Sequence, residues 1–187
     1  MQGVDGKRIA ALIGDGFEEA DLVEPRKALE EAGAIVTIVG LDEKSRARIR
    51  GKRGLDDGAV LKAEELVADC TAEDFDAVLI PGGSSPDRIR TNKEVQRLVR
   101  EFDAAKKPIF AVGHGAQVLI SAQLVRSRQV TGAHSIADDI RNAGGLYRDQ
   151  PTVGDSNWVT TRGAEDLPQF NRSMLEKLSA SGAAPAA

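Results

Sequence analysis

Short apolar runs alternate with segments whose apolar residues recur every three or four positions. RIAALIG (residues 8–14) and AIVTIVG (34–40) are apolar without alternation, which is typical of strands buried on both faces. Between them, apolar residues at positions i, i+3, i+4 and i+7 over 25–32 are followed by Gly33, which predicts a helix that ends there. This order of strand, helix and strand predicts a parallel sheet covered by helices.

The same alternation continues to the end of the chain and predicts one doubly wound, mostly parallel α/β domain over residues 1–187. Glycines punctuate residues 48–63, which predicts a hairpin-like excursion. The Ala-rich tail from about 180 to 187 is expected to fray. Further strands are predicted at 76–83, 108–113 and 157–163, and further helices after Asn92 and over 114–123, 135–143 and 167–178.

Composition narrows the possible partners. The chain of 187 residues is 41% apolar and 29% charged, which is ordinary for a globular protein, and its net charge of -4 gives no reason to expect nucleic acid or an anionic membrane. The basic cluster at residues 44–53 is interpreted as a charged surface hairpin. With no signal peptide and no membrane-length apolar stretch, we expect a cytoplasmic protein.

Cysteine and histidine are scarce, which limits metal and disulfide chemistry. The single cysteine, Cys70, permits no internal disulfide and no thiolate metal cluster, and we interpret it as a partly buried small residue. His114 and His134 with Asp21 or Asp87 could in principle hold zinc, but their spacing matches no recognised zinc signature. We therefore expect neither a metal nor another cofactor.

The candidate site lies where three core strands end. In open parallel sheets ligands bind at the carboxyl ends of the strands. GDGFEEAD (14–21), GGSSPD (82–87) and GHGAQ (113–117) leave such ends, so carboxylates, an imidazole and backbone N–H groups should surround one pocket. The third segment forms a sharp strand-to-helix turn, the elbow (residues 113–115), where other chains carry a Ser or Cys nucleophile. Its apex here is Gly113, which has no side chain.

Five segments together are typical of one known family: GFEEADLVEP, DAVLIPGGSSPDRIR, PIFAVGHGAQVLISAQLVRSRQVT, DDIRNAGG and NWVTTRGAEDLPQF. Through them the chain resembles the ThiJ/PfpI family nearly end to end, in particular its PfpI protease and stress-protein branch. The resemblance implies a flavodoxin-like α/β fold and a homo-oligomer, either a dimer or a trimer of dimers. It also implies peptide or small-aldehyde substrates and cysteine peptidase, amidase or deglycase activity.

The resemblance also implies roles for individual residues. Gly113 takes the position of the nucleophilic Cys, and His114 that of its base. Asp87 corresponds to the Glu that orients the base from the neighbouring subunit, and Asp21 to the Glu that hydrogen-bonds the Cys sulfur. The backbone N–H groups of Gly83 and His114 would form the oxyanion hole.

This sequence departs from the family pattern at the positions that matter most. Gly113 removes the attacking atom, and Asp21 and Asp87 are each one methylene shorter than the expected Glu. Both an engineered knockout and a natural pseudoenzyme fit the change at position 113. Glu18 and His134 are further candidates for the pocket, although Glu18 could equally be a solvated loop charge and His134 a surface or capping residue.

Two functions of different classes remain. The first is a stress-response protein related to the family's hydrolases, catalytically impaired at Gly113. The second is a ligand-binding or chaperone-like module that keeps the fold and the oligomer. A glutaminase subunit, a third class with the same elbow, is disfavoured because no distant His-x-Glu pair and no synthase domain are present.

Overall fold

The computed structural model describes residues 3–181 and centres on a seven-stranded sheet. Six strands are parallel, and only the edge strand β11 runs antiparallel, against β12. The expected flavodoxin-like, mostly parallel α/β fold is therefore confirmed. In spatial order the strands are β11 (Thr152–Asp155), β12 (Trp158–Thr161), β8 (Ile109–Val112), β7 (Ala77–Ile80), β1 (Arg8–Leu12), β3 (Ile35–Gly40) and β6 (Glu65–Leu66).

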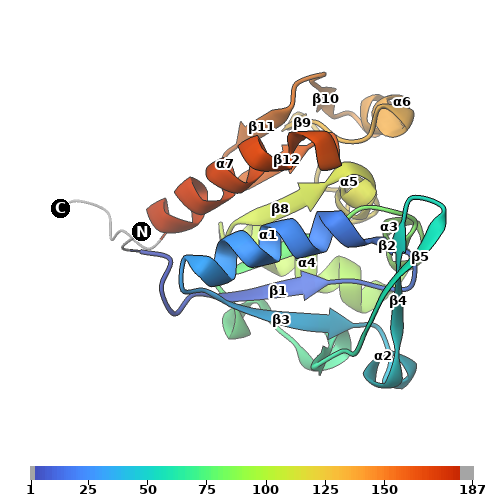
Figure 1. Cartoon of the computed structure of the whole chain (residues 1–187). Coiled ribbons are helices and arrows are strands. Elements are labelled where there is room, and N and C mark those ends of the chain that lie inside the picture. The colour runs from blue at the N-terminus through green and yellow to red at the C-terminus, as the bar shows by residue number, and fades with distance from the viewer. Residues whose placement is uncertain (1–2, 182–187) are drawn as a thin grey trace.

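Helices cover both faces of this sheet, as Figure 1 shows. The helices α1 (Glu19–Glu31) and α7 (Leu167–Ala180) lie side by side on one face. The opposite face carries α3 (Ser85–Ile89), α4 (Lys93–Ala104), α5 (Ala116–Ser121) and α6 (Ala137–Asn142). The tail expected to fray begins at the last turn of α7, and its residues 182–187 lie outside the described part of the chain.

The pleat of β1 divides its side chains between two hydrophobic cores. Ala10 and Leu12 belong to the core under α4 and α5, whereas Ile9 and Ala11 belong to the core under α1 and α7. Successive side chains of a strand point to opposite faces, so a strand covered on both faces must be apolar throughout. This packing explains why residues 8–14 show no alternation.

The predicted excursion is confirmed as a hairpin of β4 (Ile49–Arg53) and β5 (Asp56–Leu61), with β2 (Phe17–Glu18) paired to β4. The basic cluster is only partly in this hairpin, which corrects the sequence interpretation. Its first part forms the short helix α2 (Glu43–Ala47), whose start is capped by Asp42, which accepts a hydrogen bond of 3.1 Å from the Ser45 N–H.

Small elements complete the fold, and most of them were not predicted. Asn92 does cap α4 as expected, because its Oδ1 accepts hydrogen bonds from the Glu94 N–H (2.8 Å) and the Val95 N–H (3.2 Å). The remaining elements are the parallel pair β9 (Gln129–Val130) and β10 (Leu146–Tyr147) and the 3-10 helices η1 (Val67–Asp69), η2 (Ala72–Asp74), η3 (Gly113–Gly115), η4 (His134–Ile136) and η5 (Ala164–Asp166).

Candidate functional site

The loops after β1 and β7 are joined by backbone hydrogen bonds. The Glu18 N–H donates to the Gly82 carbonyl (3.1 Å) and the Ser84 N–H donates to the Gly16 carbonyl (2.9 Å), on either side of a bridge between Phe17 and Gly83. A third hydrogen bond links the same loops: the hydroxyl of Ser85, a buried residue of α3, accepts a hydrogen bond of 2.8 Å from the Gly14 N–H, just after β1. The sequence prediction that these strand ends converge is therefore confirmed.

The elbow after β8 has the backbone expected of a nucleophile turn. Gly113 has φ +56°, a left-handed conformation that glycine adopts without steric penalty. A Cβ built at Gly113 would lie 3.4 Å from the Arg162 carbonyl oxygen and 3.9 Å from Asp21 Oδ2, so a side chain fits there. At the neighbouring glycines a Cβ would approach other atoms to 2.5 Å (Gly82) and 2.4 Å (Gly115). Among these three glycines only the apex has room for a side chain.

Asp21 supplies a buried carboxyl group beside this apex. It lies in the first turns of α1, is only 4% exposed, and its Oδ2 accepts a hydrogen bond of 3.1 Å from the Gly82 N–H. Within residues 3–181, its Oδ1 has no hydrogen-bond partner. Burial and the nearby Glu18 carboxylate raise the pKa of Asp21 from 3.8 to about 7, against the opposing effect of the Gly82 N–H. Asp21 therefore exchanges its proton near neutral pH.

Two backbone N–H groups, those of Gly83 and His114, are the candidates for the oxyanion hole. The bridge to Phe17 uses the amides of Glu18 and Ser84 and not that of Gly83, whose N–H has no partner in the described structure. The His114 nitrogen belongs to the first turn after β8, 3.4 Å from where a Cβ on Gly82 would lie. The His114 amide therefore belongs to the elbow itself, whereas the joint role of the two amides as an oxyanion hole stays a prediction.

His114 has a partner that sequence reasoning missed. Its Nε2 lies 3.0 Å from the Oγ of Ser135, an exposed residue of η4. The two residues are 21 positions apart, and no motif connects them. The only signal in the sequence was the predicted helix start near residue 135, which places that segment at the same edge of the sheet.

The structure does not bring every candidate into the site. Asp87 and His134 are both exposed, and within the described chain neither forms a hydrogen bond or an ion pair with another side chain. Glu18 turns toward the hairpin, where its Oε2 accepts a hydrogen bond of 3.0 Å from the Gly54 N–H. Glu18 therefore reaches the site only through its charge, which acts on Asp21.

The segment after β12 also borders the elbow and was predicted only as a strand end. The Arg162 carbonyl is the atom nearest to the open side of Gly113. The Arg162 guanidinium is held by Asp166 (2.9 Å) and Asp149 (3.1 Å). A cavity of about 420 Å³ is lined by residues 162–166. Because two carboxylates already neutralise this arginine, it is not free to bind an anion.

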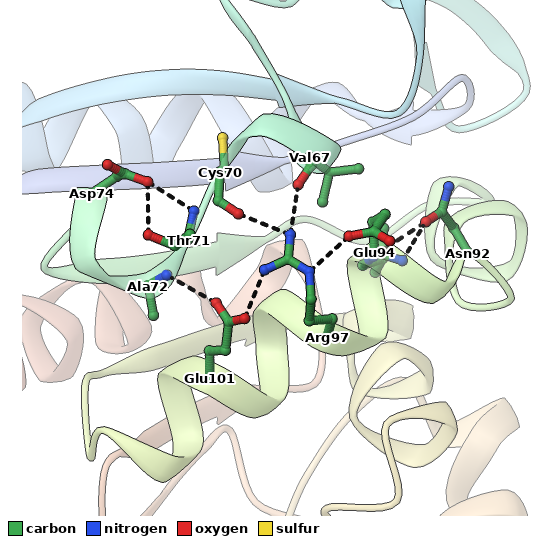
Figure 2. A network of polar contacts seen from close by, with 10 residues as sticks. Val67, Cys70, Thr71, Ala72, Asp74, Asn92, Glu94, Arg97 and Glu101 are labelled. Atoms are coloured by element: carbon green, nitrogen blue, oxygen red, sulfur yellow. Dashed lines mark hydrogen bonds and ion pairs between the residues drawn. The ribbon is translucent and has the colours of Figure 1, made fainter.

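Cys70 belongs to a structural network and not to the elbow. Its carbonyl and that of Val67 accept hydrogen bonds from the Arg97 guanidinium (2.9 and 3.2 Å), which also pairs with Glu94 and Glu101, each at 2.7 Å (Figure 2). Burial and the surrounding carboxylates raise the pKa of the Cys70 thiol to about 11. The thiol therefore stays protonated and unreactive at neutral pH, in line with its interpretation as a buried residue.

Neither a metal cluster nor a membrane helix is found in the described part of the chain. Over residues 3–181, no three His, Cys, Asp or Glu side chains gather so that they could hold a metal ion. Over the same residues, no helix is both long and apolar enough to cross a membrane.

The fold and the site together define an α/β protein with an elbow at the carboxyl end of a core strand, beside which lies the buried carboxyl group of Asp21. The chain belongs to the DJ-1/PfpI family, whose sequence pattern matches residues 7–177.

Several known proteins are similar over nearly the whole chain. "Putative cysteine protease YraA" of Bacillus subtilis is 41% identical over 92% of this chain and 98% of its own length. Protein/nucleic acid deglycase 2 of Escherichia coli is 37% identical over 93% of this chain and 99% of its own. Among solved structures, a two-domain protein of Anabaena variabilis with DJ-1/ThiJ/PfpI-like and ferritin-like domains is 37% identical with a TM-score of 0.87; the match covers 96% of this chain but only 50% of that one.

Proposed function

We propose that this chain is a stress-response protein of the DJ-1/PfpI family that has the backbone of a hydrolase site but lacks its nucleophile. The observation that carries the proposal is the elbow at Gly113, which combines a φ of +56° with room for a Cβ beside Asp21. The relatives named as a cysteine protease and a deglycase support a substrate with a peptide or aldehyde carbonyl. With Gly113 at the apex, the chain itself should have little of this activity.

The proposed chemistry requires a thiolate at position 113. The thiolate would attack the carbonyl carbon, and His114 would move the proton. The N–H groups of Gly83 and His114 would stabilise the oxyanion that forms. A protonated Asp21 would donate a hydrogen bond to the sulfur, which its raised pKa allows near neutral pH.

A homo-oligomer is part of the proposal, because the Asp87 side chain has no hydrogen-bond or ion-pair partner within residues 3–181. Asp87 is exposed on α3, so a neighbouring subunit would have to bring its carboxylate to a His114. The cytoplasm is the proposed compartment, since the one cysteine is a buried free thiol, which suits a reducing environment.

One observation favours the second candidate, a ligand-binding module. Asp21 keeps a buried Oδ1 without a partner in residues 3–181, although burying an unsatisfied polar atom costs about 1–3 kcal/mol. A bound ligand with a hydrogen-bond donor would satisfy it without any turnover. The same site would then sense a small molecule.

The test restores the thiol and measures methylglyoxal consumption and peptide hydrolysis by Gly113→Cys beside the unmodified protein. We expect a gain on the order of 100-fold or more, the range over which a positioned base acts. Gly54→Cys is the matched control, because Gly54 also has a positive φ (+62°) and open space but lies on the hairpin. If Gly113→Cys gains nothing and both proteins bind the substrate equally, the binding module replaces the enzyme.

A further inference from the structure

The contact between Ser135 and His114 has the geometry of a nucleophile and its base. The Ser135 Oγ and the His114 Nε2 are 3.0 Å apart, within the range of about 2.6–3.2 Å that such pairs show. In the tautomer with its proton on Nδ1, the imidazole accepts the hydroxyl proton at Nε2. A hydroxyl oriented in this way is poised to lose its proton to the ring.

The fold fixes both partners independently. His114 follows the apex of the elbow, and the flanking Gly113 and Gly115 are buried. Ser135 lies in η4, whose turn is closed by a hydrogen bond of 3.0 Å from the Ile136 N–H to the Ala133 carbonyl. The segment before η4 packs on the elbow so closely that a Cβ on Gly132 would lie 2.9 Å from the Gly113 carbonyl oxygen. The pair is therefore formed by two anchored turns.

We propose that Ser135 and His114 form a serine nucleophile–base dyad that hydrolyses small esters. This activity goes beyond the proposed function, because it uses neither a thiol nor position 113. Ser135 is exposed, so an acyl group can approach its Oγ from solvent. In this dyad His114 would act as a catalytic base even though Gly113, at the apex of the elbow, supplies no nucleophile.

The reaction proceeds in two balanced steps. The Ser135 Oγ attacks the ester carbonyl carbon and forms a new C–O bond, while its proton passes to His114 Nε2. The ester's own C–O bond then breaks, and the leaving alkoxide takes that proton and departs as an alcohol. Water attacks the acyl-serine with His114 again as the base, which releases the carboxylic acid and restores the Ser135 hydroxyl.

The geometry favours esters over amides. Within residues 3–181 no carboxylate of the same chain hydrogen-bonds the His114 ring, so a single subunit lacks the third group of a triad, and only Asp87 of a neighbouring subunit would supply one. An alkoxide or phenolate leaving group needs less proton donation than an amine. The substrate class is therefore short-chain esters with good leaving groups.

The experiment treats the full-length protein with an alkyl fluorophosphonate and locates the adduct by mass spectrometry, with p-nitrophenyl acetate hydrolysis in parallel. We expect one phosphonyl group on Ser135 in the unmodified protein. Ser135→Ala should lose the adduct, and His114→Gln should slow labelling and hydrolysis on the order of 100-fold. Ser173→Ala on α7 is the control and should behave like the unmodified protein. Unchanged thermal unfolding of each variant excludes loss of fold as the cause.

Labelling at another residue, no labelling, or labelling that persists in Ser135→Ala would overturn the dyad. If the hydrogen bond between Ser135 and His114 only stabilises the turn η4, we expect no phosphonyl adduct on Ser135 and no effect of His114→Gln on ester hydrolysis. The outcome is separable from that of the proposed function. The phosphonyl adduct on Ser135 is sought in the unmodified protein, which has no thiol at position 113, whereas the proposed function is tested by the gain of methylglyoxal consumption in Gly113→Cys.

Discussion

Asp21 shows how one buried residue makes stability depend on pH. Its pKa rises from 3.8 to about 7 on folding, chiefly because burial disfavours the carboxylate. Between these two values the folded chain keeps the proton while the unfolded chain releases it. The free energy of unfolding contributed by Asp21 therefore falls as the pH rises from about 4 to about 7, and levels off above that window.

Replacing this acid by a neutral amide should remove that dependence. Asp21→Asn keeps an oxygen that can accept the Gly82 N–H hydrogen bond but carries no charge. We expect the variant to gain stability relative to the unmodified protein between pH 4 and 8, by at most about 4 kcal/mol. Urea unfolding at several pH values measures this. The exposed Asp56→Asn is the control, and parallel curves for Asp21→Asn and the unmodified protein would contradict the assignment.

At the scale of elements, the hairpin is attached to the body of the protein by two carboxylates at the start of α1. Glu19 Oε2 accepts a hydrogen bond of 2.5 Å from the Ala59 N–H, and Glu18 Oε2 accepts one from Gly54 in the turn. Both glutamates are half-buried. Glu18 and Glu19 therefore hold β4 and β5 in place through these two hydrogen bonds.

Removing one of these attachments should loosen the hairpin alone. We expect Glu19→Ala to speed amide hydrogen exchange in β4 and β5 by roughly tenfold, because a lost hydrogen bond to a charged group is worth about 1.5–3 kcal/mol and part of that is recovered by water. Glu24→Ala, an exposed change on the same helix, is the control. Equal acceleration in β1 and β7 would show that the effect is global and contradict the prediction.

Strands with strong local signals were predictable, whereas contacts between distant segments were not. The strand β8 and the cap at Asn92 follow directly from apolar runs and from capping chemistry. The edge strand β11 was not predicted because its four residues, Thr152–Asp155, contain a single β-branched apolar residue and a glycine and so form no apolar run. The hydrogen bond between His114 and Ser135 was not predicted, because it depends on how two turns pack against each other. No local sequence pattern indicates that packing.

At the scale of the whole molecule, the hairpin presents apolar side chains to solvent. Leu55 is 98% exposed at its turn, and Val60 is 61% exposed on β5. The hairpin lies beyond the ends of β1 and β3 toward which their arrows point, at the same end of the molecule as α3 (Figure 1). We expect the second copy of the chain that the proposed role of Asp87 requires to bury this surface.

This surface gives a direct test of the oligomer. We expect the protein to be a dimer by light scattering, and Leu55→Asp with Val60→Asp to weaken the dimer at least tenfold, because each buried aliphatic side chain contributes about 1.5–3 kcal/mol. Ile35→Asp is the control, since Ile35 is 57% exposed but lies at the opposite end of the sheet. A monomer at high concentration would also rule out a role for Asp87 in a neighbouring site.

The open space at Gly113 bears on how this chain can change over generations. The codons GGU and GGC for glycine differ from the cysteine codons UGU and UGC only in their first base. Since a Cβ there meets nothing closer than 3.4 Å, that single base change needs no compensating substitution in the surroundings. The main barrier is the left-handed backbone, which costs a residue other than glycine about 1–2 kcal/mol. From a GGU or GGC codon a thiol can therefore appear at this position in one mutational step, and selection can act on the chemistry without first rebuilding the fold.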